Sequence, residues 1–159
     1  MPYYHPVPEK LLTQIGDITV SFAALELYMQ EMFLHLVQQT PRIAHILTSQ
    51  LTFSRLRATL ISLYKEKYGE DNGFNALKDL MAKAGKIEEE RNLITHSIWG
   101  SGNTSDSIFR IKVTAREKRG LHAEFKPYDE SMFRNFVASI QHLTGEIIQF
   151  DRDVIQKKP

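Results

Sequence analysis

Four long segments of this chain carry apolar residues at alternating spacings of three and four, and this periodicity constrains the fold more than any other feature. The first segment follows Pro8, the second and third flank a glycine-containing break at 69–73, and the fourth lies near the C-terminus. Apolar stripes with this spacing are typical of amphipathic helices that bury one face in a bundle. A shorter helix is predicted over about 42–50, because Thr40 suits an N-cap and Pro41 a first helical position.

The apolar period changes to two between the last two long helices. Two runs there alternate apolar with polar residues, with the apolar positions at Phe109, Ile111, Val113, Leu121, Ala123 and Phe125. A short segment ending in Gly120 separates the runs, which indicates a β-hairpin whose apolar face points inward. We therefore predict a single domain over 1–159. It is mainly α, an antiparallel bundle of four to five helices with one β-hairpin, about 107–126, between the last two long helices.

Composition excludes several classes of site. The 159 residues are 42% hydrophobic and 25% charged, which is the usage of an ordinary globular domain. The chain contains no cysteine, so thiolate nucleophiles and cysteine–zinc sites are excluded. A formal net charge of +1 gives no general attraction to nucleic acid. We recognise no signal sequence and no apolar run near the roughly 20 residues that span a bilayer, so we expect a cytoplasmic protein without a membrane partner.

The third long segment ends in a distinctive group of polar residues. Arg91 falls on the apolar stripe, Asn92 follows it directly, and His96 lies near the expected end of the helix. Histidine can donate or accept a proton near neutral pH. Arginine stays charged and can clamp phosphate oxygens with two parallel hydrogen bonds. The three residue types together therefore suit chemistry on a phosphate ester.

Arg91-Asn92 followed by His96 resembles the Arg-x4–6-His signature of the HEPN superfamily (higher eukaryotes and prokaryotes nucleotide-binding domains). In that superfamily the motif lies near the C-terminal end of a bundle helix, with a polar residue, often asparagine, directly after the arginine. Arg116 and His122 share the spacing but lie in the predicted hairpin. The resemblance covers roughly residues 10–98 and 129–154. The hairpin is not required by the superfamily, so the particular family stays unassigned.

The resemblance implies a metal-independent endoribonuclease that needs no metal or other cofactor and leaves 2′,3′-cyclic phosphate ends. It would act as a homodimer with two motifs facing a shared cleft, in a toxin or phage-defence system. His96 would transfer protons, Arg91 would clamp the phosphate and Asn92 would orient them. Glu26 of the first helix would support the site by orienting Arg91.

The hairpin adds basic side chains that would bind substrate. They are expected on its outward face, together with His122, and could follow an RNA backbone: Arg110, Lys112, Arg116, Lys118 and Arg119. The alternative is that these cations only protect exposed strands from edge-to-edge aggregation.

A structural interpretation of the motif is also open. Arg91 would then pair with a buried carboxylate such as Glu26 or Glu88, and His96 would cap the last carbonyls of its helix. On that interpretation the chain is a non-catalytic HEPN-like module for dimerisation or for binding nucleotide or RNA. The superfamily also suggests a third possibility, a partner of a small nucleotidyltransferase, and a toxin would have an antitoxin partner.

Overall fold

The structure is a computed structural model that describes the backbone of residues 8–101, 108–116 and 120–158. It describes their side chains except at 101, 112–116, 120–123 and 125. The elements of this part of the chain are, in order, α1 (Glu9–Val37), α2 (Pro41–Thr48), α3 (Phe53–Tyr68), α4 (Asn72–Thr95), β1 (Ile98–Ser101), β2 (Ile108–Arg116), β3 (Gly120–Tyr128), α5 (Glu130–Phe150) and the π-helical turn η1 (Asp151–Ile155). The predicted mainly α bundle, with a hairpin between the last two long helices, is confirmed.

Side-chain caps start three of the helices. In each case a side-chain oxygen accepts a hydrogen bond from the backbone N–H three residues further on, at 2.8–3.3 Å, and the pairs are Thr52 with Arg55, Asp71 with Phe74, and Asp129 with Met132. The first turn of a helix leaves its N–H groups without helical partners, so such caps fix where a helix begins. The predicted caps at Thr52 and Asp129 are confirmed. The N-cap predicted at Thr40 is different, because Thr40 precedes α2 but its side chain makes no capping hydrogen bond.

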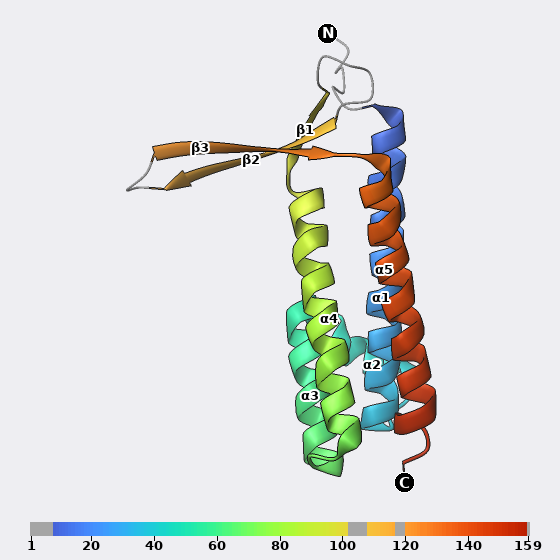
Figure 1. The fold of residues 1–159 in the computed structure, drawn as a ribbon. Coiled ribbons are helices and arrows are strands. Elements are labelled where there is room, and N and C mark those ends of the chain that lie inside the picture. The colour runs from blue at the N-terminus through green and yellow to red at the C-terminus, as the bar shows by residue number, and fades with distance from the viewer. Residues whose placement is uncertain (1–7, 102–107, 117–119, 159) are drawn as a thin grey trace.

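The first and last helices are parallel neighbours (Figure 1). Near their starts, Lys10 of α1 forms an ion pair with Glu130 of α5. Near their ends, His35 Nδ1 lies 2.7 Å from Asp151 Oδ2. Figure 1 shows α4 running in the opposite direction beside them, with α3 alongside only the half of α4 that lies away from the sheet. The long helices α3, α4 and α5 thus run in alternating directions, whereas α1 and α5 run in the same direction.

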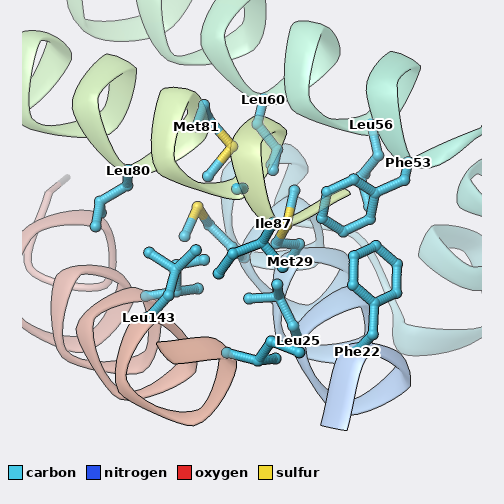
Figure 2. Close-up of a cluster of buried hydrophobic side chains, with 14 of the residues drawn as sticks. Phe22, Leu25, Met29, Phe53, Leu56, Leu60, Leu80, Met81, Ile87 and Leu143 are labelled. Atoms are coloured by element: carbon cyan, nitrogen blue, oxygen red, sulfur yellow. The ribbon is translucent and has the colours of Figure 1, made fainter. Parts of the chain in front are cut away.

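The hydrophobic core lies between the four long helices. Figure 2 shows its centre, where buried side chains of all four helices meet: Phe22, Leu25, Met29, Phe53, Leu56, Leu60, Leu80, Met81, Ile87 and Leu143. Burial of one such side chain stabilises a fold by about 1.5–3 kcal/mol. The stripes predicted from the sequence therefore supply the interior of the bundle.

The sheet has one more strand than the predicted hairpin. Its order is β1-β2-β3 and both pairings are antiparallel. The apolar stripe of the third segment suggested a helix as far as Ile98, followed by a connector at 100–105. That boundary is wrong, because α4 ends at Thr95 and Ile98 begins β1, opposite Ile111 of β2. Residues 102–107 lie outside the described part.

The predicted orientation of the hairpin is wrong for the side chains that the structure describes. Arg110, expected to face solvent, is only 5% exposed, whereas Ile98 is 61% exposed. The register places Arg110 beside Trp99, on the buried side of the sheet. Trp99 and Tyr128 each contact Phe133 of α5, with ring centroids 5.5 Å apart. Since strand side chains alternate between faces, these contacts fix the face that meets the helices.

Candidate functional site

Arg91 belongs to a column of four side chains that links α1, α3 and α4. Its Cζ lies 4.1 Å from the ring centroid of Phe22. The ring of Phe22 in turn lies 4.6 Å from that of Phe53, the first residue of α3, and Figure 2 shows the two rings next to one another. Arg57 lies beyond Phe53, with its Cζ 6.0 Å from that ring. We call these four side chains the arginine–phenylalanine column. An arginine–ring contact contributes about 0.5–2 kcal/mol.

The two arginines of the column differ in their hydrogen bonds. Arg57 Nη1 donates to the carbonyl of Met81 at 3.1 Å, and Nη2 pairs with Glu88 Oε2 at 3.1 Å. Gly85 leaves room for this side chain, because a Cβ there would lie 2.6 Å from Nη1. Among the described residues, Arg91 has no hydrogen-bond or ion-pair partner, and its Nε is buried. Arg57 is therefore fixed within the protein, whereas the N–H groups of Arg91 have no acceptor among the residues that the structure describes.

Within the described part of the chain, neither carboxylate expected beside Arg91 forms an ion pair or hydrogen bond with it. Glu88 pairs with Arg57 instead. Glu26 forms no hydrogen bond or ion pair with any described residue, so the predicted support of Arg91 by Glu26 is wrong. Phe22, one helical turn before Glu26 on α1, is the residue that contacts Arg91. The arginine is held by an aromatic ring, and the prediction of a buried ion pair is wrong.

The last carbonyls of α4 are satisfied without the imidazole of His96. Three other side chains donate to them: Thr95 Oγ1 to Arg91 at 2.9 Å, Ser97 Oγ to Leu93, and Trp99 Nε1 to Ile94 at 2.9 Å. His96 donates only its backbone N–H, to the carbonyl of Asn92 at 3.0 Å. The predicted side-chain cap is therefore wrong. The imidazole is exposed and has no hydrogen-bond partner within the described residues.

The three motif residues lie at the end of α4, but on different sides of it. Arg91 lies on the core side, Asn92 is half-buried and His96 is exposed. Five helical steps separate arginine and histidine by about 140° around the axis. His96, with φ −103° and ψ 8°, already leaves the helical conformation. A phosphate group bound by Arg91 would therefore lie beside the helix end rather than directly at His96 of the same chain.

Glu90, next to the motif, connects α4 with the sheet. Tyr128 Oη donates to Glu90 Oε1 at 2.8 Å and accepts from Arg110 Nη1 at 3.3 Å. Burial, followed by the hydrogen bond to Glu90 and its charge, raises the pKa of Tyr128 to about 12. This contact uses Arg110 inside the structure, so the prediction of an outward-facing Arg110 on a substrate surface is wrong.

The other predicted substrate-binding residues remain predictions. Lys112 and Arg116 lie in β2, of which only the backbone is described at these positions. Lys118 and Arg119 lie outside the described residues.

A second polar cluster, which the sequence did not reveal, joins the far ends of α1 and α5. Asp151 is only 8% exposed and begins the π-helical turn. Its Oδ2 lies 2.7 Å from His35 Nδ1 and accepts from Gln156 Nε2 at 2.8 Å. A cavity of about 370 Å³ adjoins the cluster and is lined in part by His35, Gln156 and Lys158. The only signal in the sequence was an aspartate directly after Phe150, where the apolar stripe is interrupted.

Comparison with known proteins leaves the function to be inferred from these sites. The chain matches no known family model, and no curated protein or solved structure is significantly similar to it. The described residues contain no group of three or more histidine, aspartate or glutamate side chains placed to hold a metal ion. Within the same residues, no helix is long and apolar enough to cross a membrane.

Proposed function

We propose that this protein is a metal-independent RNA endonuclease of the HEPN type that acts in the cytoplasm as a homodimer. One observation carries the proposal. Neither Arg91 nor His96 has the partner that a structural role would give it among the described residues. The half-buried guanidinium contacts the ring of Phe22 and donates to no described residue, so its N–H groups suit the oxygens of a phosphate. An exposed imidazole without a partner can exchange protons with a substrate.

The chemistry follows from these two groups. A base removes the proton of a ribose 2′-OH, and the oxygen attacks the adjacent phosphorus. The 5′-oxygen leaves with a proton from an acid, so the upstream product carries a 2′,3′-cyclic phosphate. His96 suits one of the proton transfers, and Arg91 suits the charge that develops on the phosphate oxygens. One chain offers a single motif histidine, so a second copy would supply the other transfer at a shared cleft.

The proposal predicts that His96→Ala slows RNA cleavage by about 10²–10⁴-fold in EDTA, the usual contribution of a general acid or base. The imidazole is exposed, so the melting temperature should stay within a few degrees of the wild type. His142→Ala is the matched control, since His142 is also an exposed histidine and lies on α5. Cleavage is followed on a mixed pool of labelled RNAs, and the ends are tested for cyclic phosphate.

Three outcomes would contradict the proposal. The wild-type protein could leave every RNA intact, His96→Ala could unfold the chain, or His142→Ala could reduce cleavage equally. Arg91→Lys supplies a further test, because lysine keeps the charge but loses the planar, bidentate geometry of arginine. This variant should cleave more slowly while remaining folded. A toxin or phage-defence setting is proposed from the same resemblance, and induction of the active chain should then arrest growth.

The alternative, a non-catalytic module that binds nucleotide or RNA, is favoured by the position of Arg91 within the arginine–phenylalanine column. If the arginine serves only to join α1 and α4, Arg91→Met should lower the melting temperature and His96→Ala should leave RNA or nucleotide binding unchanged. A nucleotidyltransferase or an antitoxin is also a proposed partner of this chain. Such a partner should co-purify with wild-type protein expressed together with its neighbouring reading frames.

A further inference from the structure

Glu88 of α4 has two arginines within reach, and the structure pairs it with the one on α3. Arg57 Nη2 lies 3.1 Å from Glu88 Oε2. On a helix, residues three or four positions apart are neighbours, with Cβ atoms about 5–6 Å apart. Of the residues at those spacings from Glu88 on α4, only Arg91 is charged. The carboxylate therefore has Arg91 as a second cation at close range.

The Glu88 side chain is mostly buried, so its charge depends on a nearby cation. It is 18% exposed, and the side chain of Arg57 is 24% exposed. When one partner of such a pair is lost, the remaining charge is left poorly hydrated, which is strongly unfavourable unless another partner replaces the first. Arg91 donates to none of the described residues, so it can serve as that partner. Without Arg57, Glu88 would turn to Arg91.

We propose that Arg57 is a positioning residue that holds Glu88 away from Arg91 and so keeps the Arg91 guanidinium open to a phosphate group of the substrate. The inference rests on the proposed function, since it concerns the same site. Within the described residues, Nε of Arg91 is buried without a partner, whereas its Nη groups are not buried. A carboxylate on these Nη groups would neutralise the charge and occupy the donors that a phosphate needs.

Other features of the site hold Arg57 against Glu88. Arg57 Nη1 donates to the carbonyl of Met81 at 3.1 Å, and its Cζ lies 6.0 Å from the ring centroid of Phe53. Gly85 supplies the space for the guanidinium, because a Cβ there would lie 2.6 Å from Nη1. Glycine is less favourable than alanine inside a helix. At this position of α4, helix propensity is therefore lower than it could be, and the Arg57–Glu88 pair is kept.

Arg57→Met tests the proposal through RNA cleavage, because methionine keeps an apolar stem but no charge. Glu88 should then pair with Arg91, and cleavage should slow by about 10²–10³-fold, the usual loss when one donor to the developing charge is removed. Adding Glu88→Gln should restore most of the rate, since the amide carries no charge to capture Arg91. Lys83→Met is the control, because it removes the cation of another ion pair of α4 and should leave cleavage unchanged.

Gly85→Ala makes the same test without removing either charge, and it replaces Arg57→Met if that variant does not fold. The added methyl group displaces the end of the Arg57 side chain from Glu88. That end is flexible, and alanine favours the helix, so the chain should remain folded. Cleavage should slow, and Glu88→Gln should again restore it. Wild-type cleavage by the folded Arg57→Met protein, or no restoration by Glu88→Gln, would overturn the proposal.

A double-mutant cycle tests the role of Arg57 without RNA. Urea denaturation gives the free energies of unfolding of Glu88→Gln, Arg91→Met and the double variant. With Arg57 present, the two effects should nearly add. In the Arg57→Met (or Gly85→Ala) background they should not, because Glu88 and Arg91 then interact. Additivity in both backgrounds would refute the inference. If the wild type cleaves no RNA, the proposed function fails, and this cycle still decides whether Arg57 keeps Glu88 from Arg91.

Discussion

Arg57 and Arg91 have different environments within one column of side chains, and this decides which of them can meet a ligand. Both lie over phenylalanine rings. Arg57 is fixed by a carbonyl and a carboxylate, in a space that Gly85 leaves open. Arg57 and Glu88 are partly buried, and their ion pair joins α3 to α4. Removal of one partner would leave the other charge without compensation. Arg91 lies over an aromatic ring, and none of the described residues accepts a hydrogen bond from it.

Gly73 illustrates how a single methyl group can oppose helix propensity. Alanine in the first turn of α4 would ordinarily stabilise a helix by up to about 1 kcal/mol. Here a Cβ would overlap the hydroxyl of the fully buried Tyr64 and lie 3.1 Å from Val154. We therefore predict that Gly73→Ala lowers the free energy of unfolding by about 1–3 kcal/mol. Urea denaturation measures this change, and a variant as stable as the wild type would contradict it.

The sheet is held to the bundle by a few contacts at its base. Figure 1 shows β2 and β3 projecting sideways from the ends of the helices. At the base, Trp99 and Tyr128 lie against each other, with ring centroids 5.2 Å apart, and both contact Phe133. Tyr128 also donates to Glu90 of α4. One tyrosine thus connects three elements, β3, α4 and α5.

The burial of Tyr128 and its hydrogen bond to Glu90 make part of the protein's stability sensitive to pH above 10. The pKa of Tyr128 is raised from 10.0 to about 12 in the folded protein by burial and by Glu90. Between these values the unfolded chain loses the phenolic proton while the folded chain retains it, so stability falls as pH rises. Its contribution is complete below pH 10 and is lost towards pH 12. Tyr128→Phe should be less stable than the wild type at pH 8, and the gap should narrow up to pH 12.

Absorbance of tyrosinate checks the same prediction directly. Above pH 10, one tyrosine of the wild type should stay protonated until about pH 12, and this tyrosine should be missing from the titration of Tyr128→Phe. Equal pH dependence of the free energy of unfolding in both proteins would contradict the assignment.

The helices could be predicted because their signals are local, and the face of the sheet could not. Thr52 and Asp129 act on N–H groups three residues further along, so their effect is readable without knowing the fold. The burial of Arg110 depends on contacts with α5 and on β1. That strand was not recognised in the sequence, because Ile98 continues the apolar stripe of α4. The side of α4 that carries Arg91 was predictable, but its neighbour, Phe22 instead of Glu26, depends on how α1 lies against α4.

Across the whole molecule, one carboxylate joins the middle of the chain to its end. Asp71 caps α4, accepts from Tyr64 Oη at 3.1 Å and pairs with Lys158 Nζ at 2.6 Å. The hydrogen bond from Lys158, and then that from Phe74 N–H, lower the pKa of Asp71 from 3.8 to about 2. A carboxyl group with a depressed pKa stabilises the fold above its unfolded value and ceases to do so as it is protonated.

We therefore predict that part of the stability conferred by Asp71 is lost as the pH falls from about 4 to 2. Asp71→Asn keeps a capping oxygen but no charge, so it should be less stable than the wild type at pH 6 and closer to it at pH 2. Thermal unfolding at a series of pH values measures both proteins. A gap in melting temperature that stays constant with pH would contradict the role of the charge.

The parallel pairing of α1 with α5 also bears on how the chain is made. Lys10 and Glu130 are roughly 120 residues apart, and the ribosome adds about 5–20 residues per second. The apolar side of α1 that α5 covers is therefore exposed for on the order of ten seconds before α5 leaves the ribosome. Packing of α5 on α1 joins segments that are far apart in the sequence, and such long-range contacts slow folding. A trigger-factor-like chaperone that shields emerging apolar helices should raise the yield of this protein more than that of a bundle whose neighbours are consecutive.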